Sequence, residues 1–506
     1  MDSPLTILDV LTLHAATRGA HPFIFHAGRR VTYRQFDRLT NQAAHALRSL
    51  GVSKGDRVTL AMGNSVDFLV GAFGIMKAGA VYNPVNPALG AKELAYILSH
   101  AAPKVIVTDI ANAPHIVSPQ LPLPPGATVA VFGAYEGTVA FDQLLARSSD
   151  DAVPITLGAS DPSTLLYTSG TTGNPKGVVF HHGSTGAAGK HFLQCLGING
   201  DDTIVAVTPL FHGNAWGATV TALQAGGTVA FPAAFHVSGF WPLVHASHAT
   251  VLYTLGTVLA MLLTREPSEL ERTSKLRVIL GLGSAPIRDR IIERFGVRHV
   301  AECFGSTDAG VVTIEPMGHP PRAGSAGPPV PGVAIRICDD AGQPLKPREV
   351  GEITIHSPHH MAEYLHDPEQ TALTLRDGWF FTGDLGYLDE DGWLYFVDRK
   401  RDVIRRGGEN ISSVLIEKTL REHPRVVEAA VIGIPDPVLG QEVKAFVVLN
   451  GPATADELRA FAAERLAKFQ VPRLWEFRDS LPKTPSQRVE KYKLRQESGT
   501  SKPLLG

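Results

Sequence analysis

The sequence has little excess charge, few cysteines and no long apolar run, and each shortage argues against a class of protein. Lysine and arginine number 47 and aspartate and glutamate 49, so the formal net charge is −2 and no basic surplus points to nucleic acid or a membrane surface. The three cysteines, at positions 195, 303 and 338, lie far apart, which fits a reducing compartment and neither a disulfide framework nor a zinc site. No window approaches about 18 uninterrupted apolar residues, so we expect no membrane span.

The remaining composition is that of an ordinary soluble globular protein. Apolar residues make up 44% of the chain and charged residues 19%. The first residues, MDSPLTILDV, hold acids where a secretory signal needs bases, and their apolar run is short, so we expect a cytoplasmic protein. At 506 residues the chain is too long for one core, which predicts two or more domains.

Strand-like and helix-like segments alternate along most of the chain. We expect strands at residues 58–62 and 104–109 and helices at residues 66–80 and 91–100. A second unit of the same kind is expected from residues 203–208, 276–280, 286–295 and 300–304. Such alternation predicts an α/β fold with largely parallel sheets covered on both faces.

From about residue 333 the predicted secondary structure changes to short β segments with glycine and proline turns. A highly charged segment at residues 398–408, DRKRDVIRRGG, follows, and we place the domain boundary there. On composition alone this segment is a solvated turn. Beyond it, a small domain with α, β, β, α order is expected from residues 414–421, 429–434, 443–449 and 455–469.

The chain is organised around residues 167–177, YTSGTTGNPKG, which combine glycines, hydroxyls and Lys176. Glycines allow close backbone approach to an anion, hydroxyls and N–H groups donate to its oxygens, and the lysine adds charge. The spacing differs from the mononucleotide loop G-x-x-x-x-G-K-[ST], because Pro175 stands in the second glycine position and Gly177 follows the lysine. A mobile linker is the alternative, but linkers seldom lie between apolar runs such as LLY and VVF.

This stretch resembles the signature loop of the adenylate-forming enzymes, the superfamily of acyl-CoA synthetases, luciferases and peptide-synthetase adenylation domains. The resemblance extends from about residue 33 to about residue 495 and implies ATP or AMP, CoA and Mg²⁺ as cofactors. It also implies a large N-terminal domain (1–398) with a small β-rich part, a hinge (399–402) and a small mobile α+β domain (403–506). In the loop it implies catalytic roles for Thr172 and Lys176. The nucleotide contacts it implies there are Thr168, Ser169, Gly170, Thr171, Thr172 and Gly173.

Two further loops, GLGSAP and ECFGSTD, follow neighbouring predicted strands. Ligands of open α/β sheets bind beyond the carboxyl ends of strands, so these loops should face one crevice. The resemblance implies that Phe304 stacks on adenine, Thr307 contacts the α-phosphate, and Asp308 holds Mg²⁺ where the family usually has a longer glutamate. The nucleotide-binding residues implied are Ser284, Ala285, Pro286, Glu302, Cys303, Phe304, Gly305, Ser306 and Thr307.

The segment PLFHGNAWGA, residues 209–218, resembles the part of the family that lines the acyl tunnel. His212, Trp216 and Gly283 are then acyl-binding, and His212 is also a catalytic candidate. The pattern FHxNAWG is similar to members that take long or bulky apolar acids, with the tryptophan as a gate. The alternative is a core tryptophan and a capped surface histidine. Which acid is bound, and the oligomeric state, cannot be predicted.

Further motifs point to the ribose and to the thiol. A lone Asp384 is more often a turn cap, but its TGD context resembles the ribose-binding acid of the family, and Arg399 matches a ribose-contacting arginine. Arg401 stands at the hinge position, where aspartate or lysine is commoner. Gly408 matches the catalytic-site glycine that lets the pantetheine thiol enter.

One departure from the family lies near the C-terminus, in LPKTPSQRVEKYKLR. The family usually reads L-P-K-T-P-S-G-K there, and its final lysine bridges carboxylate and α-phosphate during adenylation. Here Gln487 replaces the glycine and Arg488 the lysine. A planar guanidinium does not substitute for a compact ammonium without rearrangement, and Lys491 lies about 10 Å further along an extended chain. A lost donor of this kind costs about 10²–10³ in rate.

The sequence therefore predicts an acyl-CoA ligase biased towards converting acyl-AMP into acyl-CoA, with a partner enzyme supplying the adenylate. An ordinary two-step ligase that tolerates Arg488 is the main alternative. A carrier-protein-loading enzyme would share every nucleotide motif, although no carrier domain follows in this chain, which favours CoA. A luciferase-like oxygenase and a non-enzymatic nucleotide-binding protein are the remaining classes.

Overall fold

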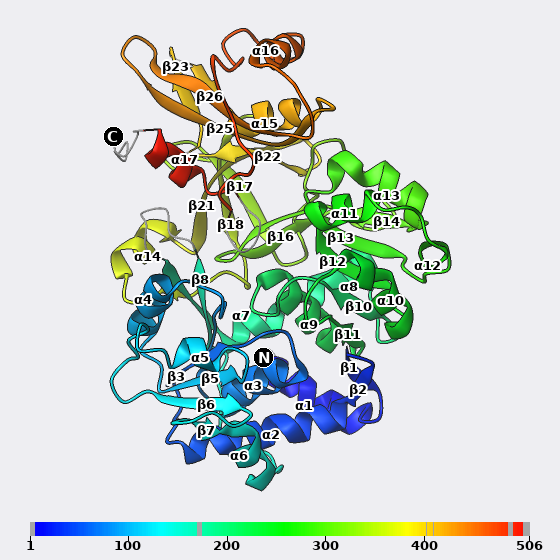
Figure 1. The fold of residues 1–506 in the computed structure, drawn as a ribbon, viewed down its shortest axis with the longest axis vertical. Coiled ribbons are helices and arrows are strands. Elements are labelled where there is room, and N and C mark those ends of the chain that lie inside the picture. The colour runs from blue at the N-terminus through cyan, green and yellow to red at the C-terminus, as the bar shows by residue number, and fades with distance from the viewer. Residues whose placement is uncertain (1–5, 169–174, 401, 408, 484–488, 499–506) are drawn as a thin grey trace. The chain divides into compact units, whose positions relative to one another are not determined.

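The computed structural model describes residues 6–168, 175–400, 402–407, 409–483 and 489–498, and it divides into two compact units (Figure 1). The first, called the large unit here, comprises residues 1–334 and 355–380. The second, called the small unit, comprises residues 335–354 and 381–506. The hinge predicted at residues 399–402 stays a prediction. Within the described residues, no helix is both long and apolar enough to cross a membrane.

An eight-stranded sheet of the large unit has the order β19-β9-β8-β4-β3-β5-β6-β7. Neighbours from β8 to β7 run parallel, and β9 and β19 add antiparallel pairs at one edge. The strands are β3 (Arg57–Ala61), β4 (Val81–Pro84), β5 (Val105–Asp109), β6 (Thr128–Phe132), β7 (Val139–Ala140), β8 (Pro162–Thr168), β9 (Lys176–His181) and β19 (Glu363–Tyr364). The strands predicted at residues 58–62 and 104–109 are confirmed as β3 and β5.

A seven-stranded sheet has the order β14-β13-β12-β10-β11-β1-β2, parallel except for the β1–β2 pair. Its strands are β1 (Pro22–His26), β2 (Arg29–Thr32), β10 (Thr203–Ala206), β11 (Thr228–Ala230), β12 (Val251–Leu255), β13 (Val278–Leu282) and β14 (His299–Ala301). A separate antiparallel pair, β15 (Cys303–Ser306) and β16 (Gly310–Ile314), follows. The single strand expected over residues 300–304 is thus wrong: it breaks at Glu302, whose N–H donates to Oε2 of Glu315 at 2.9 Å.

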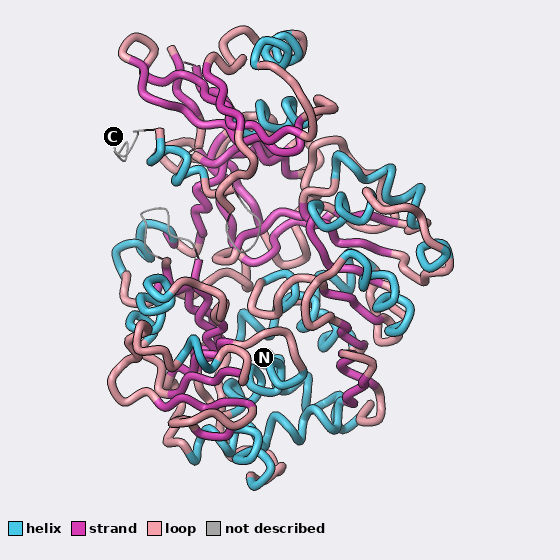
Figure 2. The backbone as a smooth tube through the Cα atoms, in the orientation of Figure 1, coloured by secondary structure: helices cyan, strands magenta, loops and turns pink. Residues whose placement is uncertain are grey.

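Helices connect these strands and share their cores (Figure 2). The helices of the large unit are α1 (Ile7–Thr17), α2 (Tyr33–Ser49), α3 (Val66–Lys77), α4 (Ala91–Ala101), α5 (Ala113–Ile116), α6 (Phe141–Arg147), α7 (His182–Ala187), α8 (Lys190–Leu196), α9 (Gly213–Ala225), α10 (Val237–Ser247), α11 (Gly256–Leu263), α12 (Glu269–Arg272), α13 (Arg288–Phe295) and α14 (Pro368–Thr374). The apolar run predicted as a buried helix forms α3, which Ser65 caps by accepting from the N–H of Phe68. Its one buried cation, Lys77, is paired with Asp37 at 2.7 Å.

In its described residues, the small unit contains mostly antiparallel β structure with three helices. β17 (Ala334–Cys338), β18 (Gly351–His356), β21 (Trp379–Leu388) and β22 (Leu394–Arg399) belong to one sheet, in which β20 (Leu375–Arg376) also pairs with β21. A second sheet contains β23 (Ile404–Arg406), β24 (Glu409–Ile411), β25 (Val426–Asp436), β26 (Gly440–Leu449) and β27 (Leu474–Phe477), with helices α15 (Ser413–Arg421), α16 (Ala455–Ala463) and α17 (Lys491–Glu497). The predicted α, β, β, α order is confirmed as α15, β25, β26 and α16. Helix α16 ends at Ala463 rather than near residue 469, and the N–H of Arg465 donates to the carbonyl of Ala462 three residues back, a tighter bond that is frequent at helix ends.

Candidate functional site

The signature stretch joins two antiparallel strands at the edge of the parallel part of the eight-stranded sheet. β8 ends at Thr168, β9 begins at Lys176, and these two residues face each other across the pair. The predicted ligands Ser169, Gly170, Thr171, Thr172 and Gly173 lie outside the described residues. The ends of the stretch are therefore held together by the strand pairing, and Lys176 is fixed at one of them.

Three residues far apart in sequence meet beside this stretch. The hydroxyl of Tyr364 donates to Oδ2 of Asp308 at 2.7 Å, and the ammonium of Lys176 lies 5.1 Å from the centre of the Tyr364 ring. Such a distance is within the range of a cation–π contact. Pairing of β19 with β9 brings Tyr364 here, opposite Val178. Burial and the neighbouring carboxylate raise the pKa of Tyr364, so its hydroxyl remains a donor at neutral pH.

A buried carboxylate fastens the GLGSAP loop to the start of β15. Oε1 of Glu302 accepts from the Ser284 hydroxyl at 3.0 Å and from the Ala285 N–H at 2.6 Å, and Oε2 accepts from the Gly283 N–H at 3.0 Å. Burial raises the pKa of Glu302, and the three donors oppose that rise. Gly283 has φ +77°, which favours glycine. The two loops predicted to face one crevice are thus in contact, and Pro286 continues the first of them into a short 3₁₀ turn.

The β15–β16 pair presents the second predicted loop. Phe304 and Ser306 are half-buried in β15 and Thr307 is exposed. Gly305 is needed for close approach, since a Cβ there would lie 2.3 Å from the carbonyl oxygen of Gly310. Cys303 is buried, and burial raises the pKa of its thiol, so it is not an accessible nucleophile.

Both acyl-binding candidates of the PLFHGNAWGA segment lie at the start of one helix. His212 is the residue before α9, and Trp216 lies in its first turn. The Trp216 ring packs 5.7 Å from that of Phe73 and 5.1 Å from that of Tyr82, measured between centroids. The side chains of His212 and Trp216 are half-buried. Trp216 therefore borders the core of the large unit while keeping part of its surface outside it.

The ribose candidates face each other in the small unit. Asp384 and Arg399 are cross-strand partners in the β21–β22 pair, and Arg399 Nε lies 3.7 Å from Oδ1 of Asp384. The Asp384 side chain is 16% exposed and that of Arg399 39%. Gly383, with φ +70°, turns the backbone immediately before the acid. Arg401 and Gly408 lie outside the described residues.

The residues on either side of the segment that departs from the family pair with each other. Lys483 and Val489 form an antiparallel β-bridge, and the N–H of Glu490 donates to the carbonyl of Pro482 at 2.8 Å. Gln487 and Arg488 themselves lie outside the described residues. The remaining lysines of this segment are each paired with an acid: Lys483 with Glu428, Lys491 with Glu417, and Lys493 with Glu490.

The Lys491 pair is nearly buried. Its ammonium lies 2.7 Å from Oε1 of Glu417 and donates to the Ser413 hydroxyl at 2.6 Å, and the paired side chains are only 13% and 11% exposed. Oε1 of Glu417 also accepts from the Val431 N–H at 2.8 Å. Removing one partner of such a pair typically costs about 3–5 kcal/mol. Lys491 therefore joins α17 to α15, and the expectation that it does not replace the family lysine stays a prediction.

The residues around Asp308 fit a magnesium ion only in company with a nucleotide. Mg²⁺ commonly takes one or two carboxylates and completes its shell with water and substrate phosphates. Within the described part of the chain, no group of three or more histidine, cysteine, aspartate or glutamate side chains converges to hold a metal. Asp308 offers a suitable oxygen donor, so the donor set fits an ion that binds with phosphate.

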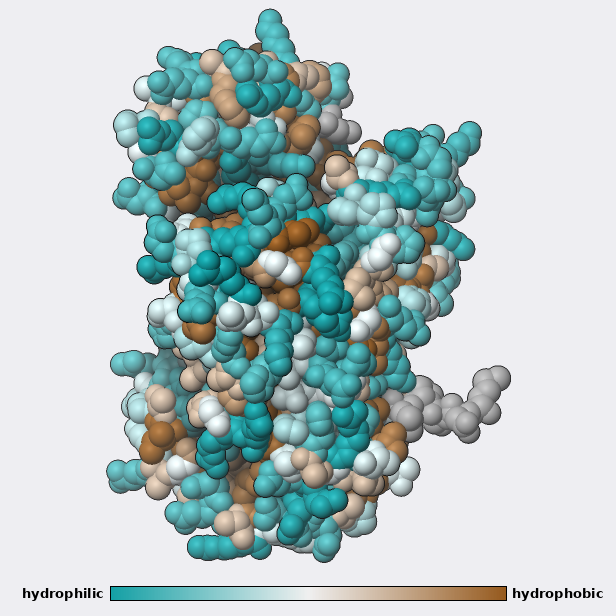
Figure 3. Space-filling model, turned by 90° about the vertical axis from the view of Figure 1, so that its right-hand side faces the viewer, coloured by the Kyte–Doolittle hydropathy of each residue, from teal (hydrophilic) through white to brown (hydrophobic). Residues whose placement is uncertain are grey.

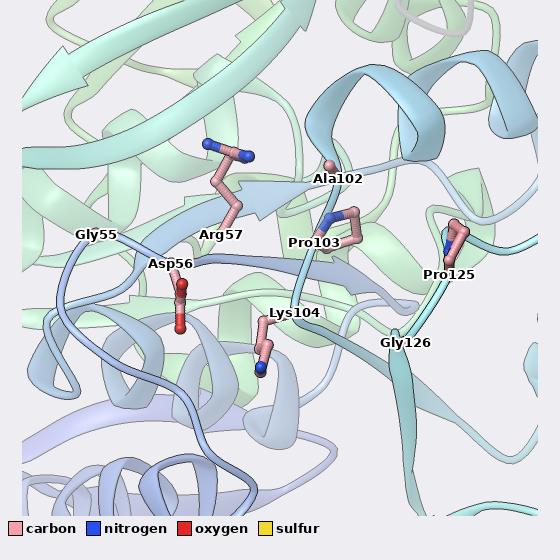
Figure 4. A pocket seen from close by; sticks show the side chains of 8 residues that line it. All are labelled: Gly55, Asp56, Arg57, Ala102, Pro103, Lys104, Pro125 and Gly126. Carbon is pink, nitrogen blue, oxygen red and sulfur yellow. The ribbon is translucent and has the colours of Figure 1, made fainter.

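A pocket of about 250 Å³ lies at the amino-terminal ends of β3, β5 and β6 in the eight-stranded sheet (Figure 4). Arg57 points to one side there, while Asp56 and Lys104 point to the other. Arg57 also donates to the carbonyl of Ala101. Ligands of parallel sheets bind at the carboxyl ends of strands, so this pocket is no candidate for the nucleotide. On the face shown in Figure 3, hydrophilic residues cover most of the surface and hydrophobic residues lie among them.

Comparison with known proteins identifies the class. The family model of the AMP-binding enzymes matches residues 11–365, and that of the AMP-binding enzyme C-terminal domain matches residues 415–488. The chain is 34% identical to a fatty acid–[acyl-carrier-protein] ligase, ScoC, of Streptomyces coeruleorubidus, over 97% of this chain and 96% of the relative. It is 34% identical to a crotonobetaine/carnitine–CoA ligase of Salmonella paratyphi C, over 92% and 93%.

A solved structure agrees with this assignment. The anthranilate CoA ligase AuaEII, in complex with anthranoyl-AMP, matches with a TM-score of 0.89 at 27% identity, over 99% of this chain and 98% of that one. The fold and the site residues define an adenylate-forming ligase. The chain belongs to the AMP-binding enzyme family, and its kind is that of the acyl-CoA, aryl-CoA and acyl-carrier-protein ligases.

Sequence reasoning missed Tyr364 and the role of Glu302 as a fastener. Tyr364 lies in a two-residue strand, which carries no usable periodicity, so only the tertiary pairing with β9 reveals its position. The nucleotide contact implied for Glu302 stays a prediction, and the structure adds that its carboxylate oxygens accept from the neighbouring loop. The sequence shows an acid in one predicted strand and a glycine-rich loop after its neighbour, but it does not show that the acid is buried against that loop.

Proposed function

We propose that this enzyme forms acyl-CoA from a bulky or long apolar acid and that it favours the second half-reaction, the attack of CoA on acyl-AMP. In that step the thiolate of CoA attacks the carbonyl carbon of the adenylate. The new C–S bond replaces the bond from carbon to the phosphate oxygen, AMP leaves with that oxygen, and the thiol proton passes to solvent.

Residues of the large unit would bind the phosphate, the adenine and the acyl group. Lys176 supplies positive charge beside the signature stretch, and Tyr364 orients the carboxylate of Asp308. Mg²⁺ held by Asp308 would neutralise phosphate charge. The loop fastened by Glu302 presents Gly283 and Ala285 next to Phe304, which would stack on adenine. His212 and Trp216 at the start of α9 would border the acyl group.

The small unit would supply the ribose contacts and the passage for the thiol. Asp384 would accept from the two ribose hydroxyls, and Arg399, 3.7 Å from that carboxylate, would orient it. Gly408 leaves room for the pantetheine thiol, and residues 399–402 form the hinge. These roles follow from the family resemblance of the motifs.

The bias rests on one observation: the lysine of the family motif is replaced in this chain, and the next lysine along the sequence is held in a nearly buried ion pair. Gln487 and Arg488 occupy the glycine and lysine positions, while Lys491 is held by Glu417 and Ser413 in a nearly buried site. Releasing Lys491 would leave Glu417 buried without its cation. Adenylation would then lack its compact donor, whereas thiol attack does not use it, and a separate enzyme would supply acyl-AMP.

The test offers the full-length protein either acid with ATP and CoA, or preformed acyl-AMP with CoA. We expect the second route to be faster by about 10²–10³. The double variant Gln487→Gly, Arg488→Lys should raise ATP–pyrophosphate exchange by a comparable factor, while Arg405→Lys, at an exposed arginine of the same unit, should not. Equal rates by both routes would support the ordinary two-step ligase instead.

A carrier-protein acceptor is the second candidate, because one relative is named a fatty acid–[acyl-carrier-protein] ligase. Acyl-AMP incubated with equal concentrations of CoA and of holo acyl-carrier protein decides between them. We expect the CoA ester to form at least about tenfold faster. Preferential loading of the carrier protein would replace CoA by that partner and leave the adenylate chemistry unchanged.

A further inference from the structure

Two histidines of the large unit are buried next to each other. His191 lies in α8 and His359 in the turn after β18, and their ring centroids are 5.0 Å apart. The residues are only 5% and 8% exposed. Both nitrogens of the His191 ring and Nδ1 of His359 have no hydrogen-bond partner among the described residues. Buried polar groups are nearly always paired, so two such rings together call for an explanation.

Both rings are neutral at physiological pH. Burial lowers the pKa of His191 to about 3, with a further contribution from His359. Burial also lowers the pKa of His359 to about 4, helped by His360. A neutral imidazole carries one N–H donor and one nitrogen acceptor. The pair therefore presents both kinds of hydrogen-bonding group at a buried position.

The pair lies against elements that the proposed function uses. The Cβ of His359 is 3.4 Å from the place that a Cβ on Gly310 would occupy, two residues after Asp308. Phe192, beside His191, packs 5.4 Å from the ring of Tyr253. The hydroxyl of Tyr253 in turn donates to that of Thr221, in the same helix, α9, that carries Trp216.

We propose that His191 and His359 bind a hydroxyl group on the acyl substrate, at a position remote from the reacting carboxyl. The substrate is then an apolar acid that carries an alcohol, a class narrower than the acids of the proposed function, on which this inference rests. One alcohol oxygen accepts from the N–H of one ring and donates its hydrogen to the bare nitrogen of the other. A carboxylate only accepts, so it would need a protonated ring, which burial opposes.

The experiment compares matched adenylates with the full-length protein and CoA. Straight-chain acids of a series of lengths are converted to acyl-AMP with and without a terminal hydroxyl, and kcat/KM for CoA-ester formation is measured for each pair. At the best length we expect the hydroxylated substrate to be favoured about tenfold or more, because a site built to bind a hydroxyl discriminates against the analogue that lacks it.

Variants then link this preference to the histidine pair. His191→Leu and His359→Leu should each bring the ratio to about one or below, whereas His191→Gln, which keeps a donor and an acceptor, should retain part of it. His182 is the matched control: it is also buried with neither ring nitrogen partnered among the described residues, but it lies in α7, to which the proposed function gives no role. His182→Leu should leave the ratio unchanged.

Three results would overturn the inference. No preference of the wild type at any length, the result expected when ordered water satisfies the rings, refutes a substrate role. A preference that survives both leucine variants, with folding verified by circular dichroism and the glutamine variant as a second probe, refutes the role of this pair. If no adenylate of the series forms a CoA ester, the proposed function is refuted as well. This outcome distinguishes failure of the proposed function from failure of the hydroxyl-binding inference alone.

Discussion

The hydroxyl of Tyr364 donates to the carboxylate of Asp308 at 2.7 Å, although 56 residues separate the two in sequence. The pair joins the short strand β19 to the loop after β15, and Lys176 lies over the same tyrosine ring. A hydrogen bond to a charged group contributes about 1.5–3 kcal/mol. This contact therefore both orders the loop and orients the only carboxylate in it.

Tyr364→Phe should lower kcat/KM for CoA-ester formation by about tenfold, because Asp308 loses the donor that orients it. The Mg²⁺ concentration for half-maximal activity should rise at the same time. Initial rates over a magnesium series measure both quantities. Tyr395→Phe is the matched control, since Tyr395 donates to Asp389 at 3.3 Å in the small unit. An unchanged magnesium requirement in Tyr364→Phe would refute the orienting role of this hydroxyl.

Glu302→Gln should weaken AMP binding by about tenfold or more. A glutamine offers one acceptor oxygen and one amide, whereas three loop donors now share two carboxylate oxygens, so at least one N–H loses its partner. Calorimetric titration with AMP measures the effect. Glu293→Gln, at an exposed position of α13, is the control and should bind AMP like the wild type. If both variants bind equally well, the fastening of this loop is not needed for the nucleotide.

Lys491→Met should destabilise the small unit by about 3–5 kcal/mol, because Glu417 would remain buried without its cation. Urea unfolding followed by the fluorescence of a tryptophan in that unit reports the change. Lys493→Met removes a pair whose lysine is 44% exposed and should cost less than about 1 kcal/mol. Similar midpoints for the two variants would show that the buried position of Lys491 is unimportant.

Stability should fall as the pH drops below about 6.5, the ordinary pKa of histidine. The folded-state pKa of His191 is about 3 and that of His359 about 4, so between these values and about 6.5 the unfolded chain binds protons that the folded chain does not. Each residue then contributes a slope of about 1.4 kcal/mol per pH unit, with stability rising as pH rises. Unfolding midpoints at pH 7 and pH 5 measure it.

The double variant His191→Leu, His359→Leu should lose a corresponding part of this slope. His182, whose pKa burial lowers to about 4, should retain its own share in that background. A slope identical to that of the wild type would mean that the pair does not remain neutral and buried in solution.

Much of the fold was predictable because its elements carry local signals. The apolar residues of α3 and the short apolar runs of β3 and β5 indicate their structures without tertiary information. The contact between the loops that contain Ser284 and Phe304 was also predictable, because loops that follow neighbouring parallel strands lie at the same end of the sheet. The break at Glu302 was not, because it depends on an N–H that pairs with Glu315, the residue that follows β16.

The contacts that complete the site depend on long-range pairing. Tyr364 reaches Asp308 only through the β19–β9 pair, and Lys491 finds Glu417 only when α17 packs near α15. His191 and His359 likewise come from distant segments, and neither is part of a motif. Such contacts depend on the fold as a whole, so periodicity and composition do not indicate them.

The β-bridge between Lys483 and Val489 holds together the two ends of the five-residue segment that includes Gln487 and Arg488. Both ends are anchored at one point of the small unit, so replacing what they enclose leaves the flanking framework in place. Under the proposed function, exchanging this segment between relatives should alter adenylation alone and leave the attack of CoA on acyl-AMP intact.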